Sequence, residues 1–176
     1  MSIIKQLILF SLLLVLFNQY SFGQITDMSF QLLSIRQEVR RIDKDSSLKI
    51  KELDNDKFID GTDNGSQLNG YFKGDSIYKM RAWIGLSFWT IQTEYYFKHE
   101  KLIFVYEKQF TNIDSTGEVD YTKPKLSFEG RYYLKDDKII RTKESGTRYM
   151  PMEGAITNML FKDSKSYEKM LKAKKK

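Results

Sequence analysis

The chain has 176 residues, a length typical of a single domain, and its 29 Lys and Arg exceed its 23 Asp and Glu by six. It contains no cysteine and one histidine. This composition excludes disulfides, thiol catalysis, zinc fingers, iron–sulfur clusters and a metal site built on two histidines. We expect no cofactor and no metal.

Residues 1–23 have the three-part pattern of a secretory signal peptide. Lys5 supplies the positive charge, residues 7–17 are almost purely apolar, and Ser21 and Gly23 are small residues at the spacing that signal peptidase requires. The apolar run is shorter than the roughly 20 residues that a transmembrane helix needs. We therefore expect cleavage near Gly23 and secretion into the periplasm or the extracellular space. An uncleaved N-terminal anchor is the alternative, and would be the chain's only link to a membrane.

We expect residues 24–176 to form one α+β domain. Its first element is an amphipathic helix over residues 24–45, because apolar residues recur there at alternating spacings of three and four. These residues are Ile25, Met28, Leu32, Ile35, Val39 and Ile42.

From residue 47 the hydrophobic period changes to two, which predicts strands joined by short polar turns. We expect a curved antiparallel meander of six to seven strands over residues 47–143, with a short helix over 157–173 that closes one edge or end of the sheet. The loop at 54–66 is rich in Asp, Asn and Gly and is predicted to be a solvated turn rather than a calcium site. The strand candidates are 47–53, 67–73, 76–84, 87–98, 101–109, 125–134 and 138–143.

Residues 71–78, 96–103 and 133–140 repeat one pattern: an aromatic, a bulky residue, Lys, two turn residues, a polar residue and two large residues. This pattern predicts three two-residue β-hairpins. Because opposite residues share a face, Phe97 should face Leu102 and Tyr95 should face Phe104, on an apolar face under the N-terminal helix. A register error of one residue would exchange the two faces.

The opposite face of the sheet is the candidate ligand-binding surface. Three tyrosines at equivalent hairpin positions form a row there, and we expect them to be exposed. The alternative is cross-strand packing of aromatic residues and cross-strand pairing of charges. The candidate residues are Tyr71, Tyr96, Tyr133, Glu94, Glu107, Glu129 and Arg131.

Two hairpin motifs and the helix preceding them resemble a family of exported bacterial proteins common in Bacteroidota. The matching segments are Glu94-Tyr95-Tyr96-Phe97 with Lys101-Leu102-Ile103-Phe104-Val105, Arg131-Tyr132-Tyr133 with Lys138-Ile139-Ile140-Arg141, and residues 35–45. His99-Glu100 and Asp136-Asp137 replace the Asn-Gly turns of that family. The resemblance implies export and a helix-plus-meander layout, and it implies no activity.

These observations favour a non-catalytic exported protein that binds a protein, peptide or glycan at the cell envelope. No nucleic-acid partner is expected, because export separates the basic chain from nucleic acid. One alternative is a glycoside-hydrolase-like or other carboxylate-based hydrolase that uses two of Glu94, Glu107 and Glu129. Another is an envelope component that self-associates through its sheet edges or through the apolar stripe of the N-terminal helix.

Overall fold

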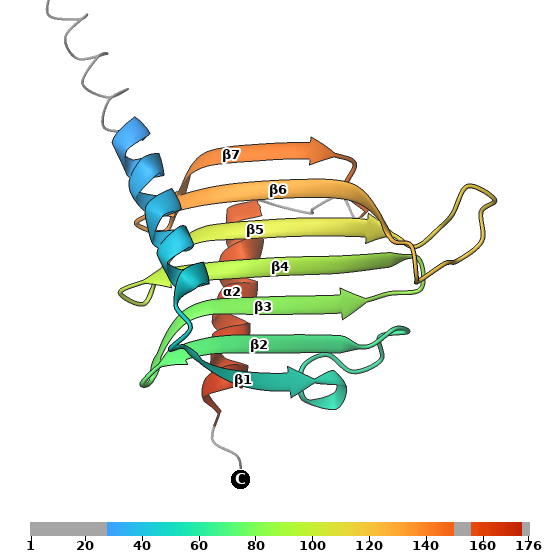
Figure 1. Ribbon diagram of the computed structural model, residues 1–176, viewed down its shortest axis with the longest axis horizontal. Coiled ribbons are helices and arrows are strands. Elements are labelled where there is room, and N and C mark those ends of the chain that lie inside the picture. The colour runs from blue at the N-terminus through green and yellow to red at the C-terminus, as the bar shows by residue number, and fades with distance from the viewer. Residues whose placement is uncertain (1–27, 150–155, 174–176) are drawn as a thin grey trace, which may run out of the picture. The chain divides into compact units, whose positions relative to one another are not determined.

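The computed structural model describes residues 28–149 and 156–173, and the signal-peptide prediction for residues 1–23 lies outside them. The chain forms two compact units, Met1–Gln37 and Glu38–Lys176. A helix over residues 28–44 begins in the first unit and ends in the second. The second unit contains an open antiparallel sheet whose seven strands lie in chain order (Figure 1). The predicted α+β meander is confirmed.

The strands lie within a few residues of their predicted positions, because the hydrophobic period and the turn residues that predict them are local signals. A 3-10 turn, η1 (Asn55–Lys57), follows the first strand, and α2 (Ile156–Lys172) is the C-terminal helix. The strands are β1 (Lys49–Asp54), β2 (Ser66–Lys73), β3 (Ser76–Gly85), β4 (Trp89–Lys98), β5 (Lys101–Thr111), β6 (Lys125–Lys135) and β7 (Lys138–Gly146).

The three repeated segments form the predicted two-residue hairpins. In the β4–β5 turn, His99 and Glu100 both have positive φ, at 50° and 62°. Asp136 and Asp137 do the same in the β6–β7 turn, at 46° and 59°. Two positive φ angles in succession are the mark of a type I′ turn, whose twist matches that of the flanking strands. These turns therefore place non-glycine residues in the left-handed region.

Each hairpin also contains a one-residue β-bulge on its return strand, which the sequence pattern did not indicate. Tyr96 pairs with Phe104 and Phe97 with Leu102, so that Ile103 is the extra residue. Tyr78 and Ile140 are the extra residues in the β2–β3 and β6–β7 hairpins. The prediction that Tyr95 faces Phe104 is wrong, because Tyr95 pairs with Val105. Each bulge moves the rest of its return strand to the opposite face.

The face of the sheet that carries Tyr95, Val105 and Tyr132, called the inner face here, holds the main core. α2 crosses this face (Figure 1) and contributes Leu160 and Leu171 to a cluster of buried residues from the strands. The strand residues of this cluster include Leu68, Ile77, Met80, Ala82, Tyr95, Phe97, Leu102, Val105, Tyr132 and Leu134.

The position of α2 corrects two expectations. The helix packs on the inner face and does not close an edge of the sheet. The core beneath a helix was predicted to involve the N-terminal helix, whereas α2 supplies its helical residues. Gly70 allows the close approach, because a Cβ atom there would lie 2.7 Å from Cδ1 of Leu171. In the stretches 28–149 and 156–173, neither helix combines the length and the apolar character that crossing a bilayer would require.

The turn conformations predict opposite effects for one substitution at two equivalent positions. Asp137→Gly should raise the free energy of unfolding by about 0.5–1 kcal/mol, because glycine adopts positive φ without strain. Asp75→Gly should lower it by a similar amount, since Asp75 is not among the residues with positive φ and glycine only adds unfolded-state entropy there. Urea unfolding of both variants measures the difference, and shifts of the same sign would contradict it.

Candidate functional site

The seven candidate residues divide between the two faces of the sheet. Cross-strand pairing aligns Tyr71, Lys79, Tyr96, Phe104 and Tyr133 on the face opposite α2, called the outer face here. The next outer row contains Glu94, Tyr106 and Arg131, and Glu129 belongs to the row after it. Glu107 pairs with Thr93 and Gly130 on the inner face. The prediction that Glu107 shares a face with the other six candidates is therefore wrong, because the bulge at Ile103 shifts β5 by one residue.

The tyrosine row is not the exposed platform that the sequence suggested. Tyr96 is 2% exposed and Tyr133 7%, while Tyr71 is half-buried. Phe104 lies between them, with ring centroids 5.7 Å from Tyr96 and 4.9 Å from Tyr133. Cross-strand packing therefore accounts for the row, because aromatic rings at these distances stabilise one another.

A compact polar network surrounds the Tyr96 hydroxyl within the second unit. The hydroxyl lies 2.8 Å from Oε2 of Glu94 and 3.0 Å from Oδ1 of Asp43, and it can donate to only one of them. The Lys79 side chain is 13% exposed, and its ammonium group lies 2.8 Å from Asp43 and 3.0 Å from Glu94. Burial, followed by the charge of Glu94, raises the pKa of Tyr96. Glu94 is therefore committed to holding Asp43 and the sheet together.

Glu129 belongs to a second ion-pair network on the outer face. The Arg131 guanidinium donates to both of its carboxylate oxygens, at 2.7 and 3.0 Å, and the Tyr106 hydroxyl donates a third hydrogen bond. The bond from Tyr106, together with those from Arg131, lowers the pKa of Glu129. Burial and Glu129 raise the pKa of Tyr106 to about 12. A carboxylate held ionised in this way is a poor general acid.

Glu107 is the centre of a network on the inner face. It is 4% exposed, and its Oε1 accepts hydrogen bonds from Arg148 at 2.5 Å and Gln109 at 2.6 Å. The Arg148 guanidinium also donates to the Tyr132 hydroxyl, which in turn donates to Glu144. Sequence reasoning missed Arg148, because it follows the last predicted strand and no spacing ties it to Glu107.

The charge of Glu107 affects the pKa of a side chain on α2. Asp163 on that helix has a raised pKa, first because it is buried and, less strongly, because Glu107 is near. Oε2 of Glu107 has no hydrogen-bond partner among the described residues. No group of three or more His, Asp and Glu side chains in the described part of the chain could hold a metal ion. The inner network is thus a buried ion pair that fastens the segment after β7 to the sheet.

A groove of about 560 Å³ opens on the outer face. It lies at the ends of β1 to β4 that are farther from the β2–β3 and β4–β5 hairpin turns. Its walls carry mostly neutral hydrogen-bonding side chains around a single indole ring. We call it the outer-face groove; its lining residues are Asp54, Asn55, Asn64, Gly65, Ser66, Gln67, Asn69, Arg81, Trp83 and Gln92.

Two glycines lie next to Trp83 in the outer-face groove. A Cβ atom at Gly85 would lie 2.9 Å from the Trp83 ring and 2.7 Å from the Asn64 carbonyl oxygen. At Gly65, which has φ of +84°, it would lie 3.6 Å from the ring. A side chain at position 85 would therefore collide with the ring and with the Asn64 backbone, whereas a Cβ atom at position 65 would make ordinary van der Waals contact with the ring. Sequence reasoning missed this groove, because no spacing in the sequence relates Trp83 to the residues around it.

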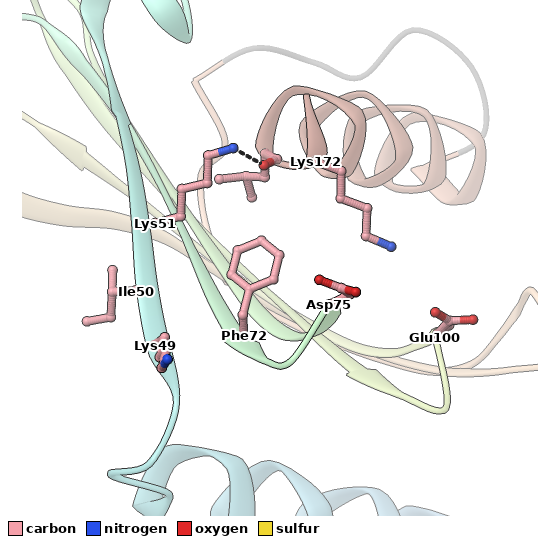
Figure 2. A pocket seen from close by; sticks show the side chains of 8 residues that line it. Lys49, Ile50, Lys51, Phe72, Asp75, Glu100 and Lys172 are labelled. Atoms are coloured by element: carbon pink, nitrogen blue, oxygen red, sulfur yellow. Dashed lines mark hydrogen bonds between the residues drawn. The ribbon is translucent and has the colours of Figure 1, made fainter. Parts of the chain in front are cut away.

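A second cavity, of about 580 Å³, lies where the end of α2 meets β1 and the hairpin turns (Figure 2). Lys51 points toward the helix end and donates to the carbonyl oxygens of Leu171, at 2.5 Å, and Ala173, at 3.1 Å. A cation at this position satisfies terminal carbonyl groups and opposes the helix dipole. Lys172 pairs with Glu168 at 2.7 Å. This cavity lies at the contact between α2 and the sheet, and both lysines already form intramolecular bonds there.

Comparisons with known proteins assign no function to the chain, so the functional assignment rests on the geometry of the site. No protein-family model, no curated protein and no solved structure matches the chain. The outer-face groove is the candidate site, because several of its polar side chains are not used by the networks that hold the two faces.

The inner network predicts unequal effects for two carboxylates that share one guanidinium. Glu107→Ala should lower the free energy of unfolding by about 3 kcal/mol, because it removes the buried partner of Arg148. Glu144→Ala, the matched control, should cost less than about 1 kcal/mol, since Glu144 is 42% exposed and lies 3.4 Å from Arg148. Urea unfolding measures both values. Equal losses would show that Glu107 does not anchor the segment after β7.

Proposed function

We propose that this is an exported, non-catalytic binding protein of the periplasm or extracellular space, and that it binds its ligand in the outer-face groove. The observation that carries the proposal is the groove itself: a concave, mostly neutral polar surface built around the positioned ring of Trp83. Binding sites are typically concave and combine apolar or aromatic surface with a few placed polar groups. The proposal keeps the binding function inferred from the sequence and moves its site from the tyrosine row to this groove.

The hydrolase alternative loses its supporting residues. A glycoside hydrolase needs two carboxyl groups roughly 5–10 Å apart across a cleft, one of which donates a proton. Glu107 lies on the face opposite Glu94 and Glu129, and Glu129 has a lowered pKa. Glu94 is bound to Lys79 and Tyr96. None of the three lines the outer-face groove.

Self-association through sheet edges is disfavoured by the charge on both edge strands. β1 has the sequence KIKELD, and β7 has the sequence KIIRTKESG. Charged side chains on an edge strand, lysines above all, oppose pairing with a second copy. We therefore propose ligand binding in the groove rather than pairing of an edge strand with a second copy.

Export predicts a defined N-terminus for the mature protein. When the full chain is produced in a bacterial host with its own signal peptidase, the protein recovered from the periplasm or medium should begin near Gln24. Mass spectrometry of the purified protein measures this end. Replacing Leu13 and Leu14 by Arg should retain the protein in the cytoplasm uncleaved, because the apolar segment is interrupted. Recovery of an uncleaved chain in the membrane fraction would instead support the anchor alternative.

Ligand binding is testable by saturation-transfer NMR with the purified protein. The probes are a set of envelope fragments: muropeptides, neutral and acidic oligosaccharides, and short peptides. We expect at least one probe to bind with a Kd below about 1 mM, and to lose about tenfold in affinity in Arg81→Ala. Arg141→Ala is the matched control, because Arg141 is exposed on the same face, on β7, outside the groove. Binding of no probe, or equal binding by both variants, would contradict the proposal.

A further inference from the structure

We infer that the outer-face groove selects a neutral saccharide. This inference rests on the proposed binding function and names the ligand class of the same site. It follows from the charge balance of the groove, from the order of its side chains across β2, β3 and β4, and from a buried amide oxygen of a lining residue that has no hydrogen-bond partner among the described residues.

The groove is electrically balanced and rich in groups that both donate and accept hydrogen bonds. Of its ten lining residues, six have neutral polar side chains, and the two charged residues, Asp54 and Arg81, cancel. An amide carries two donors and an acceptor, and so matches a sugar hydroxyl, which donates and accepts in turn. A phosphate or an acidic peptide would require an excess of cations, and a lipid would require apolar walls.

The cross-strand register puts an aromatic ring between two amides. Gln67 on β2, Trp83 on β3 and Gln92 on β4 are directly opposite one another. Neighbouring strands lie about 4.8 Å apart, so the two amides flank the indole at about that distance on either side. A pyranose ring presents an apolar C–H face and a rim of hydroxyl groups. This row can take the C–H face on Trp83 and the hydroxyls on Gln67 and Gln92.

The next outer row adds two more lining groups to the groove. Asn69 and Arg81 are paired across β2 and β3, two residues along from Gln67 and Trp83. Asn69 donates to Oε1 of Gln67 at 3.3 Å, while its own Oδ1 is buried without a hydrogen-bond partner among the described residues. A buried acceptor without a partner is destabilising, and a rotation of the amide would present it to a ligand hydroxyl. Asn69 thus has hydrogen-bonding capacity that the fold does not use.

The rim of the groove is held by hydrogen bonds within the fold. Oδ1 of Asn55 accepts from the Ser66 backbone at 2.8 Å, and the Ser66 hydroxyl donates to the Ile59 carbonyl oxygen at 2.7 Å. These bonds fix the segment between β1 and β2 against the sheet. The groups offered to a ligand are therefore presented by a preorganised frame, which reduces the entropy lost on binding.

Trp83 reports directly on occupancy of the groove. The chain has two tryptophans, so Trp89→Phe leaves Trp83 as the sole indole, and a phenyl ring preserves the stacking of residue 89 on Tyr149. The probes are cellotriose, maltotriose and chitotriose as neutral saccharides, with trigalacturonate as the acidic saccharide and trialanine as the peptide. Quenching of Trp83 fluorescence by acrylamide is measured as each probe is added.

At least one neutral trisaccharide should protect Trp83 from quenching with a Kd below about 1 mM, while trigalacturonate and trialanine should not. Gln67→Ala and Gln92→Ala should each weaken that binding about tenfold, because each removes a hydrogen-bonding amide beside the ring. Gln37→Ala is the matched control and should change nothing, since Gln37 is exposed on the N-terminal helix and does not line the groove.

The outcomes separate this inference from the function on which it rests. Protection of Trp83 by trigalacturonate or trialanine alone would overturn the saccharide assignment and leave the groove as a binding site. Protection by a neutral saccharide that is unchanged in both glutamine variants would overturn the proposed binding geometry. If no probe protects Trp83 and no envelope fragment binds in the NMR screen, the proposed function fails as well.

Discussion

The three one-residue bulges at Tyr78, Ile103 and Ile140 determine which side chains meet on each face of the sheet. A strand alternates faces with a period of two, so one inserted residue moves every later side chain on its strand to the other face. Here the insertion follows the turn in each hairpin. It moves Val105 and Glu107 to the inner face, where α2 packs, and Phe104 and Tyr106 to the outer face.

This shift gives both faces of the sheet an aromatic layer. The doublet Tyr95-Tyr96 contributes one ring to each face, and Tyr132-Tyr133 does the same. Buried tyrosine hydroxyls need partners, and each face supplies them. Asp43 and Glu94 are next to Tyr96, whereas Glu144 and Arg148 are bonded to Tyr132. The chain has no cysteine and so no disulfide. The sheet is therefore stabilised by packing on both faces and by the ion pairs on each face.

The secondary structure could be predicted from the sequence because it depends on local signals. Hydrophobic period and turn residues located all seven strands and the hairpins, and a cluster of apolar residues indicated the C-terminal helix. The faces of the return strands could not be predicted, since the run Leu102–Tyr106 is apolar throughout and suits either register. The position of α2 depends on contacts such as that between Gly70 and Leu171, which are far apart in the chain. For the same reason the candidate site differs from the predicted one: an exposed tyrosine row was inferred from alternation, while the groove around Trp83 is built from four strands and the loop before β2.

The neutral groove is unusual in a chain whose formal net charge is +6. Long-range attraction of a cationic protein for anions acts on the whole surface and is screened within about 8 Å at physiological ionic strength. The groove is lined by one residue of each charge, Asp54 and Arg81, so on the proposed function selection there would rest on hydrogen bonds and on the Trp83 ring. Those interactions depend on the direction and spacing of the amides, which the register of β2, β3 and β4 fixes. On the proposed function, the net positive charge of the chain would favour an anionic envelope surface, while the groove would discriminate among ligands by shape and hydroxyl geometry.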